Sequence, residues 1–244
     1  MTRKDIWTKN KMRIIIIVDT SYSMEGKPIA QVNAAMGPLK KKLSKEAEKE
    51  GIEVEIKVIA FNDTAWYVVG SDDAWKNIDD FTWQDVSASG STSTPKALKL
   101  ANESLRLGAG SETHLLHPVV ILLTDGACNP GEHQAYLKEI ETMKKKLAGN
   151  TGKEKVNRIG IGVGDYYNEA EIEEFASVGI INDQVQPLIF KVDHAEELAG
   201  AINWVAVTSL QRSILPGQDE LLNMGYIDEE DEESWITEED MEEV

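Results

Sequence analysis

Two carboxylates and several hydroxyl groups stand in three short polar segments whose residue types suit a metal ion. The first segment is Asp19-Thr20-Ser21-Tyr22-Ser23, the second contains Thr92, and the third is Asp125-Gly126. Carboxylate and hydroxyl oxygens are hard ligands, which suit Mg²⁺ or Mn²⁺ better than zinc or copper. Only two of these groups carry a formal negative charge, and the rest are neutral hydroxyls, so the ion can also accept a carboxylate from outside. The pattern predicts a Mg²⁺ site, with Mn²⁺ as an alternative ion, formed by Asp19, Ser21, Ser23, Thr92 and Asp125.

Two of these segments follow apolar runs typical of buried strands. Residues 12–19 (MRIIIIVD) and 119–124 (VVILLT) are rich in β-branched and aliphatic residues, as expected for central strands covered on both faces. In an open α/β sheet, ligands bind at the carboxyl ends of strands where the winding direction switches. The two loops lie there if the two strands are neighbours. The small-residue stretch 87–94 (SASGSTST) provides the third loop.

Strand-like and helix-like segments alternate along the chain, which predicts a mostly parallel sheet with helices on both faces. We expect about six strands, at 12–19, 53–61, 65–70, 119–124, 157–163 and 188–192. The 65–70 strand follows a short turn and is expected to be an antiparallel edge strand. Helical periodicity predicts helices at 28–50, from Pro95 through Leu105, and at about 132–147, 169–178 and 194–215. The predicted fold class is α/β.

The ordered motifs closely resemble the metal-ion-dependent adhesion site of von Willebrand factor A (vWA) domains. They are Asp19-x-Ser21-x-Ser23, residues 90–98 (GSTSTPKAL) and residues 123–126 (LTDG), and the resemblance spans residues 13–210. It implies a Rossmann-like fold. It also implies that Ser21, Ser23 and Thr92 contact the metal directly or nearly so, that Asp19 and Asp125 act directly or through water, and that a partner protein donates a glutamate or aspartate. Ser91 departs from the family pattern, because many relatives have glycine there.

Residues 15–29 (IIIVDTSYSMEGKPI) look like the bacterial tellurium-resistance-associated, TerY-like subgroup. That resemblance implies a scaffold beside a Ser/Thr kinase and a protein phosphatase in a stress, tellurite-resistance or phage-defence system. An adaptor of an AAA+ ATPase is an alternative. A metal-assisted hydrolase is a third possible function, but it needs a general base, and the sequence identifies none. Walker A, H-E-x-x-H and G-x-S-x-G motifs are absent from the sequence, so we expect no enzyme.

Charge divides the chain into a mildly acidic body and a strongly acidic end. Thirteen acidic residues and no Lys or Arg lie in residues 219–244, and removing them from the net charge of −18 leaves −5. Such a chain is a poor nonspecific binder of nucleic acid. We predict an N-terminal extension at 1–11, a vWA domain at 12–216 and an acidic tail at 217–244. Apolar residues such as Trp235 make docking on a partner as plausible as a solvated tail, and a tail carboxylate could reach a metal site.

The remaining features predict a reducing compartment and no further site. Apolar runs are far shorter than a membrane span, no secretory signal is recognisable, and one cysteine excludes an internal disulfide, so a cytoplasmic location is expected. Cys128 is interpreted as a plain small residue. The four histidines show no ligand spacing and are expected at the surface or in the core: His114, His117, His133 and His194. Gly160-x-Gly162-x-Gly164 is interpreted as a strand approached closely by its neighbours, because it lacks dinucleotide-binding spacing.

Overall fold

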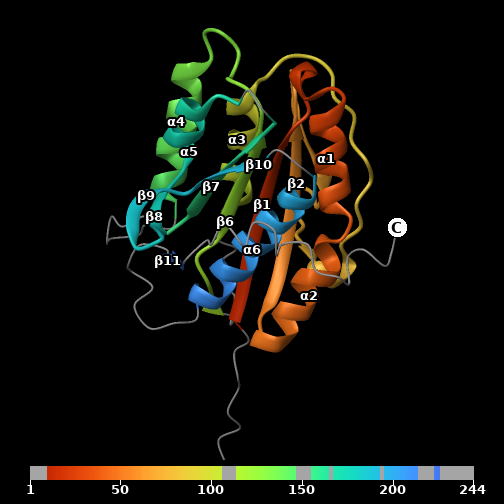
Figure 1. Cartoon of the computed structure of the whole chain (residues 1–244), viewed down its shortest axis with the longest axis vertical. Helices are drawn as coiled ribbons and strands as arrows, with labels where there is room; N and C mark the ends of the chain where they lie inside the picture. The colour runs from red at the N-terminus through yellow and green to blue at the C-terminus, as the bar shows by residue number, and fades with distance from the viewer. Residues whose placement is uncertain are drawn as a thin grey trace, which may run out of the picture.

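A mostly parallel sheet runs through the middle of the computed structural model (Figure 1). The structure describes residues 10–105, 114–146, 155–164, 167–192, 195–213 and 223–225. His194, nearly all of the predicted N-terminal extension and most of the predicted acidic tail lie outside these residues. The six main strands are β1 (Asn10–Asp19), β2 (Glu53–Phe61), β3 (Ala65–Val69), β6 (Val119–Thr124), β7 (Asn157–Val163) and β10 (Ile189–Val192).

The strand order is β10-β7-β6-β1-β2-β3, with β3 antiparallel to β2 at one edge. Two short strands add to this sheet: β4 (Lys76–Asn77) pairs antiparallel with β2, and β5 (His114–Leu115) pairs parallel with β1. The predicted α/β class, the mostly parallel sheet and the antiparallel edge strand are therefore confirmed. The first strand begins at Asn10, two residues earlier than predicted.

β1 is buried on both faces because helices cover both sides of the sheet. Met12, Ile14, Ile16 and Val18 belong to one apolar cluster, whereas Ile15 and Ile17 belong to the other. Successive strand residues point to opposite faces, so an uninterrupted apolar run is needed where both faces are covered. The first cluster is covered by α1 (Lys27–Met36), α2 (Leu39–Glu50) and α6 (Ala195–Ser213), and the second by α3 (Thr94–Ser104), α4 (His133–Lys145) and α5 (Glu169–Phe175) (Figure 1).

The single helix predicted at 28–50 is wrong, because the structure has two helices there. α1 ends at Met36 and α2 begins at Leu39. Pro38 lies between them. A proline has no N–H to donate to the carbonyl four residues earlier, and its ring crowds that carbonyl, so a continuous helix is disfavoured at this point. The apolar positions of both helices still face one core, so their spacing in the sequence predicted a single continuous helix.

A small second sheet was not predicted from the sequence. β8 (Val178–Ile181) and β9 (Gln184–Pro187) form a β-hairpin with a two-residue turn. β11 (Asn223–Gly225) pairs parallel with β8. Asn182 and Asp183 make the turn with positive φ angles of 51° and 58°, a conformation that Asn and Asp tolerate better than most residues. The predicted helix at 169–178 is therefore too long: α5 ends at Phe175 and Val178 starts a strand.

The glycine-rich strand β7 is closely packed, as predicted. A Cβ atom on Gly160 would lie 2.1 Å from Cγ2 of Ile172 on α5. Glycine at this position lets α5 approach the sheet. In the described part of the chain, no helix combines the length and the apolar character needed to cross a membrane.

Candidate metal site

The loops after β1 and β6 lie side by side because the two strands are neighbours. Val18 pairs with Leu123 at the end of the parallel ladder. The chain leaves β1 towards β2 on one side, whereas β6 and β7 continue on the other side. The winding direction therefore switches between β1 and β6, which is the position where open α/β sheets bind ligands. The adjacency on which the predicted site depends is present.

Asp19 is the buried end of the cluster, with a side chain that solvent does not reach. Its Oδ1 accepts a hydrogen bond from the Ser21 backbone N–H at 2.8 Å, and its Oδ2 accepts one from Thr124 Oγ1 at 2.6 Å. Burial raises the pKa of Asp19 to about 6, although the hydrogen bonds from Thr124 and Ser21 oppose that rise. Both partners are neutral donors. A buried carboxylate held in this way is better stabilised when a cation is also present.

Ser21, Ser23 and Asp125 form a chain of contacts from the buried side to the surface. The hydroxyls of Ser21 and Ser23 lie 3.1 Å apart, and Ser23 Oγ donates to Asp125 Oδ1 at 2.8 Å. The short 3₁₀ turn η1 (Tyr22–Met24) curls the first loop so that alternate serines meet. Ser21 is buried and Ser23 is exposed. Partial burial raises the pKa of Asp125.

Hydrogen bonds of its backbone groups hold Thr92 in place. Its N–H donates to Asn129 Oδ1 at 2.9 Å, and its carbonyl accepts from the Asn129 N–H at 2.8 Å. The Tyr22 N–H donates to the Gly90 carbonyl at 2.9 Å, which ties the same loop to the first one. The structure thus joins Asp19, Ser21, Ser23 and Asp125 through their functional groups and brings the Thr92 loop against both neighbouring loops.

The site is also shaped by three residues that the sequence motifs do not predict: Asp63, Thr124 and Asn129. Ser91 donates to Asp63 Oδ1 through both its hydroxyl and its backbone N–H. Gly90 has a φ of +76°, and a Cβ atom there would lie 2.2 Å from Asp63 Oδ2. Ser91, the departure from the family pattern, therefore holds its loop to the turn after β2. In the sequence, nothing except its position in that turn pointed to a role for Asp63 at the site.

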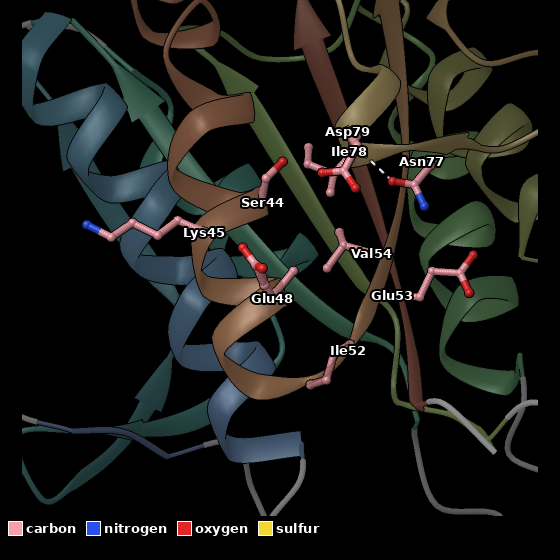
Figure 2. Close-up of a pocket in the computed structure, with 10 residues that line it drawn as sticks. Ser44, Lys45, Glu48, Ile52, Glu53, Val54, Asn77, Ile78 and Asp79 are labelled. Carbon is pink, nitrogen blue, oxygen red and sulfur yellow. Dashed lines mark hydrogen bonds between the residues drawn. The ribbon is translucent and has the colours of Figure 1, made fainter. Parts of the chain in front are cut away.

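Figure 2 shows a surface hollow of about 550 Å³ that is separate from this cluster. Residues from α2, such as Ser44 and Glu48, line it together with Glu53 and Val54 at the amino end of β2. Phe61, at the carboxyl end of β2, pairs with Asp19. The hollow and the ligand loops therefore lie at opposite ends of the sheet.

The arrangement defines a class of protein: an open α/β domain with a cluster of carboxylate and hydroxyl oxygens at the switch point of its sheet. The sequence profile of the von Willebrand factor type A domain matches residues 14–203. The chain belongs to this family. Comparison with curated protein sequences found no match.

Solved structures of several other proteins share the fold. A von Willebrand factor type A protein of Catenulispora acidiphila is 16% identical with a TM-score of 0.59, over 83% of this chain and 43% of that one. The pilus adhesin SpaC of Lactobacillus rhamnosus GG is 15% identical with a TM-score of 0.60, over 84% and 31%. Mussel proximal thread matrix protein 1 with a zinc-occupied MIDAS motif is 22% identical with a TM-score of 0.53, over 84% and 46%. The matched region is thus less than half of each of these chains.

Proposed function

We propose that the protein is a metal-dependent protein-binding module. A divalent cation, Mg²⁺ or alternatively Mn²⁺, would be held by Asp19, Ser21, Ser23, Thr92 and Asp125 and would accept a Glu or Asp carboxylate from a partner protein. The observation that carries this proposal is the buried Asp19 carboxylate, held by neutral donors and joined to an oxygen chain that ends at the surface. The zinc-occupied MIDAS motif of the mussel protein supports a divalent ion at this kind of site.

The exposure of the cluster supports binding by an external carboxylate. Asp19 and Ser21 are buried, whereas Ser23 is exposed and Asp125 is half-buried. A cation held by these groups has ligands on its protein side and solvent on the other. Tyr22, between the two serines, is 69% exposed and offers an apolar surface beside the metal. A partner that presents an acidic residue next to an apolar one would fit both features.

Binding accounts for the cluster better than hydrolysis does. A metal-assisted hydrolase needs a base next to the metal-bound water. In the described part of the site, Asp19 and Asp125 are the proposed ligands, and the other carboxylates hold loops in place. Asp63 accepts two hydrogen bonds from Ser91, and Glu132 accepts from Ser93 and Asn129. We therefore propose a protein without catalytic activity. It would act in the cytoplasm, as the single cysteine suggests, as a scaffold in a TerY-like kinase and phosphatase system or as an adaptor of an AAA+ ATPase.

Affinity capture from native cells tests the proposal. The full chain should retain its partner in Mg²⁺ and lose it in EDTA, and Asp19→Ala should lose it in Mg²⁺. Asp85→Asn is the matched control, because Asp85 is exposed and outside the cluster. A partner retained in EDTA and by Asp19→Ala would contradict the proposal and would move binding to another surface.

Direct titration separates metal binding from partner binding. Calorimetry with Mg²⁺ should give a binding signal for the wild type and for Asp85→Asn, and none for Asp19→Ala. At a dissociation constant of about 0.1 mM, about 1 mM Mg²⁺ adds only about 1.4 kcal/mol to stability, so a direct titration is more decisive than thermal melting. Equal Mg²⁺ binding by wild type and Asp19→Ala would rule out the ligand set.

A further inference from the structure

Three side chains that commonly bind metals lie together outside the oxygen cluster. They are Cys128 on the loop after β6, His133 at the start of α4, and Glu171 on α5, and their ligand atoms lie within 4.8 Å of one another. The sequence alone predicts no metal-binding role for Cys128 or His133. Glu171 is distant in the sequence and reaches them because α5 packs beside α4, as Figure 1 shows.

Glu171 is held so that one oxygen points at the other two groups. The Cys128 backbone N–H donates to Glu171 Oε2 at 2.7 Å. The second oxygen, Oε1, lies 3.6 Å from Cys128 Sγ and 3.7 Å from His133 Nδ1. The backbone contact restricts the carboxylate before any ion binds, which lowers the cost of ordering a ligand.

These separations match those between neighbouring ligands around zinc. Zinc bonds of about 2.0 Å to oxygen, 2.1 Å to nitrogen and 2.3 Å to sulfur, at tetrahedral angles, place O and S about 3.5 Å apart and O and N about 3.4 Å apart. The observed values are 3.6 Å and 3.7 Å. An N–H to carboxylate hydrogen bond would bring His133 to about 2.7–2.9 Å instead.

The second nitrogen of His133 faces a different carboxylate. Nε2 of His133 lies 3.5 Å from Glu174 Oε1, one turn further along α5. Metal-binding histidines usually direct their other ring N–H at a carboxylate or carbonyl, which orients the ring and selects the tautomer. Glu171 thus lies near Nδ1 of His133, and Glu174 lies near Nε2 of the same ring.

We propose that Cys128, His133 and Glu171 form a second metal site that binds Zn²⁺, with Glu174 as a positioning residue for His133. A thiolate, an imidazole and a carboxylate are a ligand set that zinc accepts, and their two negative charges balance the ion. The Cys128 side chain is buried, whereas that of His133 is 42% exposed, so the ion can enter from the histidine side.

Zinc would replace the thiol proton. Burial, together with the neighbouring Glu171, raises the pKa of Cys128 to about 12, so the metal-free side chain is a neutral thiol. Binding forms a sulfur–zinc bond and releases that proton to solvent. With three protein ligands, the fourth position of the ion is left for water or another small ligand.

The two sites share one loop. Asn129, next to Cys128, holds Thr92 through two hydrogen bonds. Zinc at the second site would tie this loop to α4 and α5, and so would restrict the segment that carries Asp125. The assignment of the second site does not depend on the proposed function, because its three residues lie outside the oxygen ligand set.

Cobalt spectroscopy of the full chain tests the second site. Co²⁺ bound to a thiolate gives a near-ultraviolet charge-transfer band, and the chain has one cysteine, so the band reports on Cys128 alone. In excess Mg²⁺, the wild type should show the band on Co²⁺ addition and lose it when Zn²⁺ is added. Cys128→Ser should show no band. His133→Gln should weaken Co²⁺ binding at least as much as Glu174→Gln, for which about a tenfold loss is expected.

Glu169→Gln is the matched control for Glu171→Gln, because Glu169 is exposed on the same helix. The control should bind Co²⁺ as the wild type does, and Glu171→Gln should bind it more weakly. Absence of the band in the folded wild type would overturn the proposal. The proposal would also be overturned if His133→Gln and Glu171→Gln both showed the band and bound Co²⁺ as tightly as the wild type. Cys128 would then bind cobalt with other partners.

Discussion

Thr124 Oγ1 donates a 2.6 Å hydrogen bond to Asp19 Oδ2, and so joins the ends of β1 and β6 across the switch point of the sheet. Both residues are buried. The bond fixes one carboxylate oxygen of Asp19, while the Ser21 backbone N–H fixes the other. Hydrogen bonds to both of its carboxylate oxygens therefore define the orientation of Asp19.

Replacing Thr124 by Val should destabilise the metal-free protein. Val keeps the shape of the side chain but leaves a buried carboxylate oxygen without its donor, which costs about 1–3 kcal/mol. Urea unfolding in EDTA measures the change. Thr124→Ser keeps the hydroxyl and should recover most of the loss. A Val variant as stable as the wild type would show that the contact contributes nothing to folding.

Metal-free stability should fall as pH rises through about 6. Burial raises the pKa of Asp19 from 3.8 to about 6 in the folded chain, so the folded state holds more protons than the unfolded state between these values. The contribution of Asp19 therefore favours folding at pH 5 and diminishes towards pH 7. Unfolding free energies in EDTA across this range measure the slope.

Asp19→Asn is the control for that pH dependence, because it cannot titrate. Its stability should vary less between pH 5 and pH 7 than that of the wild type. Mg²⁺ should reverse the trend, because the ion competes with the proton for the carboxylate and binds better above pH 6. The same slope in both proteins would assign the pH dependence to other groups.

Asn129→Ala should weaken Mg²⁺ binding through Thr92. The variant loses the side-chain acceptor of the Thr92 N–H and so frees the loop that carries the Thr92 hydroxyl. If Asn129 acts only by placing Thr92, the losses of affinity in Asn129→Ala and Thr92→Ala should not add in the double variant. Calorimetric Mg²⁺ titrations of the four proteins measure this. Additive losses would indicate an independent role for Asn129.

Gly160→Ala should destabilise the fold by about 1–3 kcal/mol, the usual cost of overpacking. The added Cβ would lie 2.1 Å from Ile172 Cγ2, and the Cβ atom of Ile172 is farther away at 3.5 Å. Ile172→Ala removes Cγ2, so the double variant should lose less stability than the sum of the two single variants. Thermal or urea unfolding checks this, and simple additivity would argue against the contact.

Local pattern was sufficient to predict the fold class. The β-branched run IIIIV in β1 is typical of a strand covered on both faces, and the alternation of such runs with amphipathic segments predicted the parallel sheet. The break at Pro38 was also present in the sequence, since a proline in a helical pattern marks a boundary. The β8–β9 hairpin was missed because its Asn182-Asp183 turn joins two short strands with little periodicity.

Residue types and local spacing were enough to predict the six main strands and the oxygen-rich segments that follow two of them. Which side chains meet depends on tertiary packing. The hydrogen bond from Thr124 to Asp19 requires β6 to pair with β1, and the contact between Glu171 and Cys128 requires α5 to pack beside α4. Such contacts join residues far apart in the sequence, and their geometry depends on how the sheet and helices pack together.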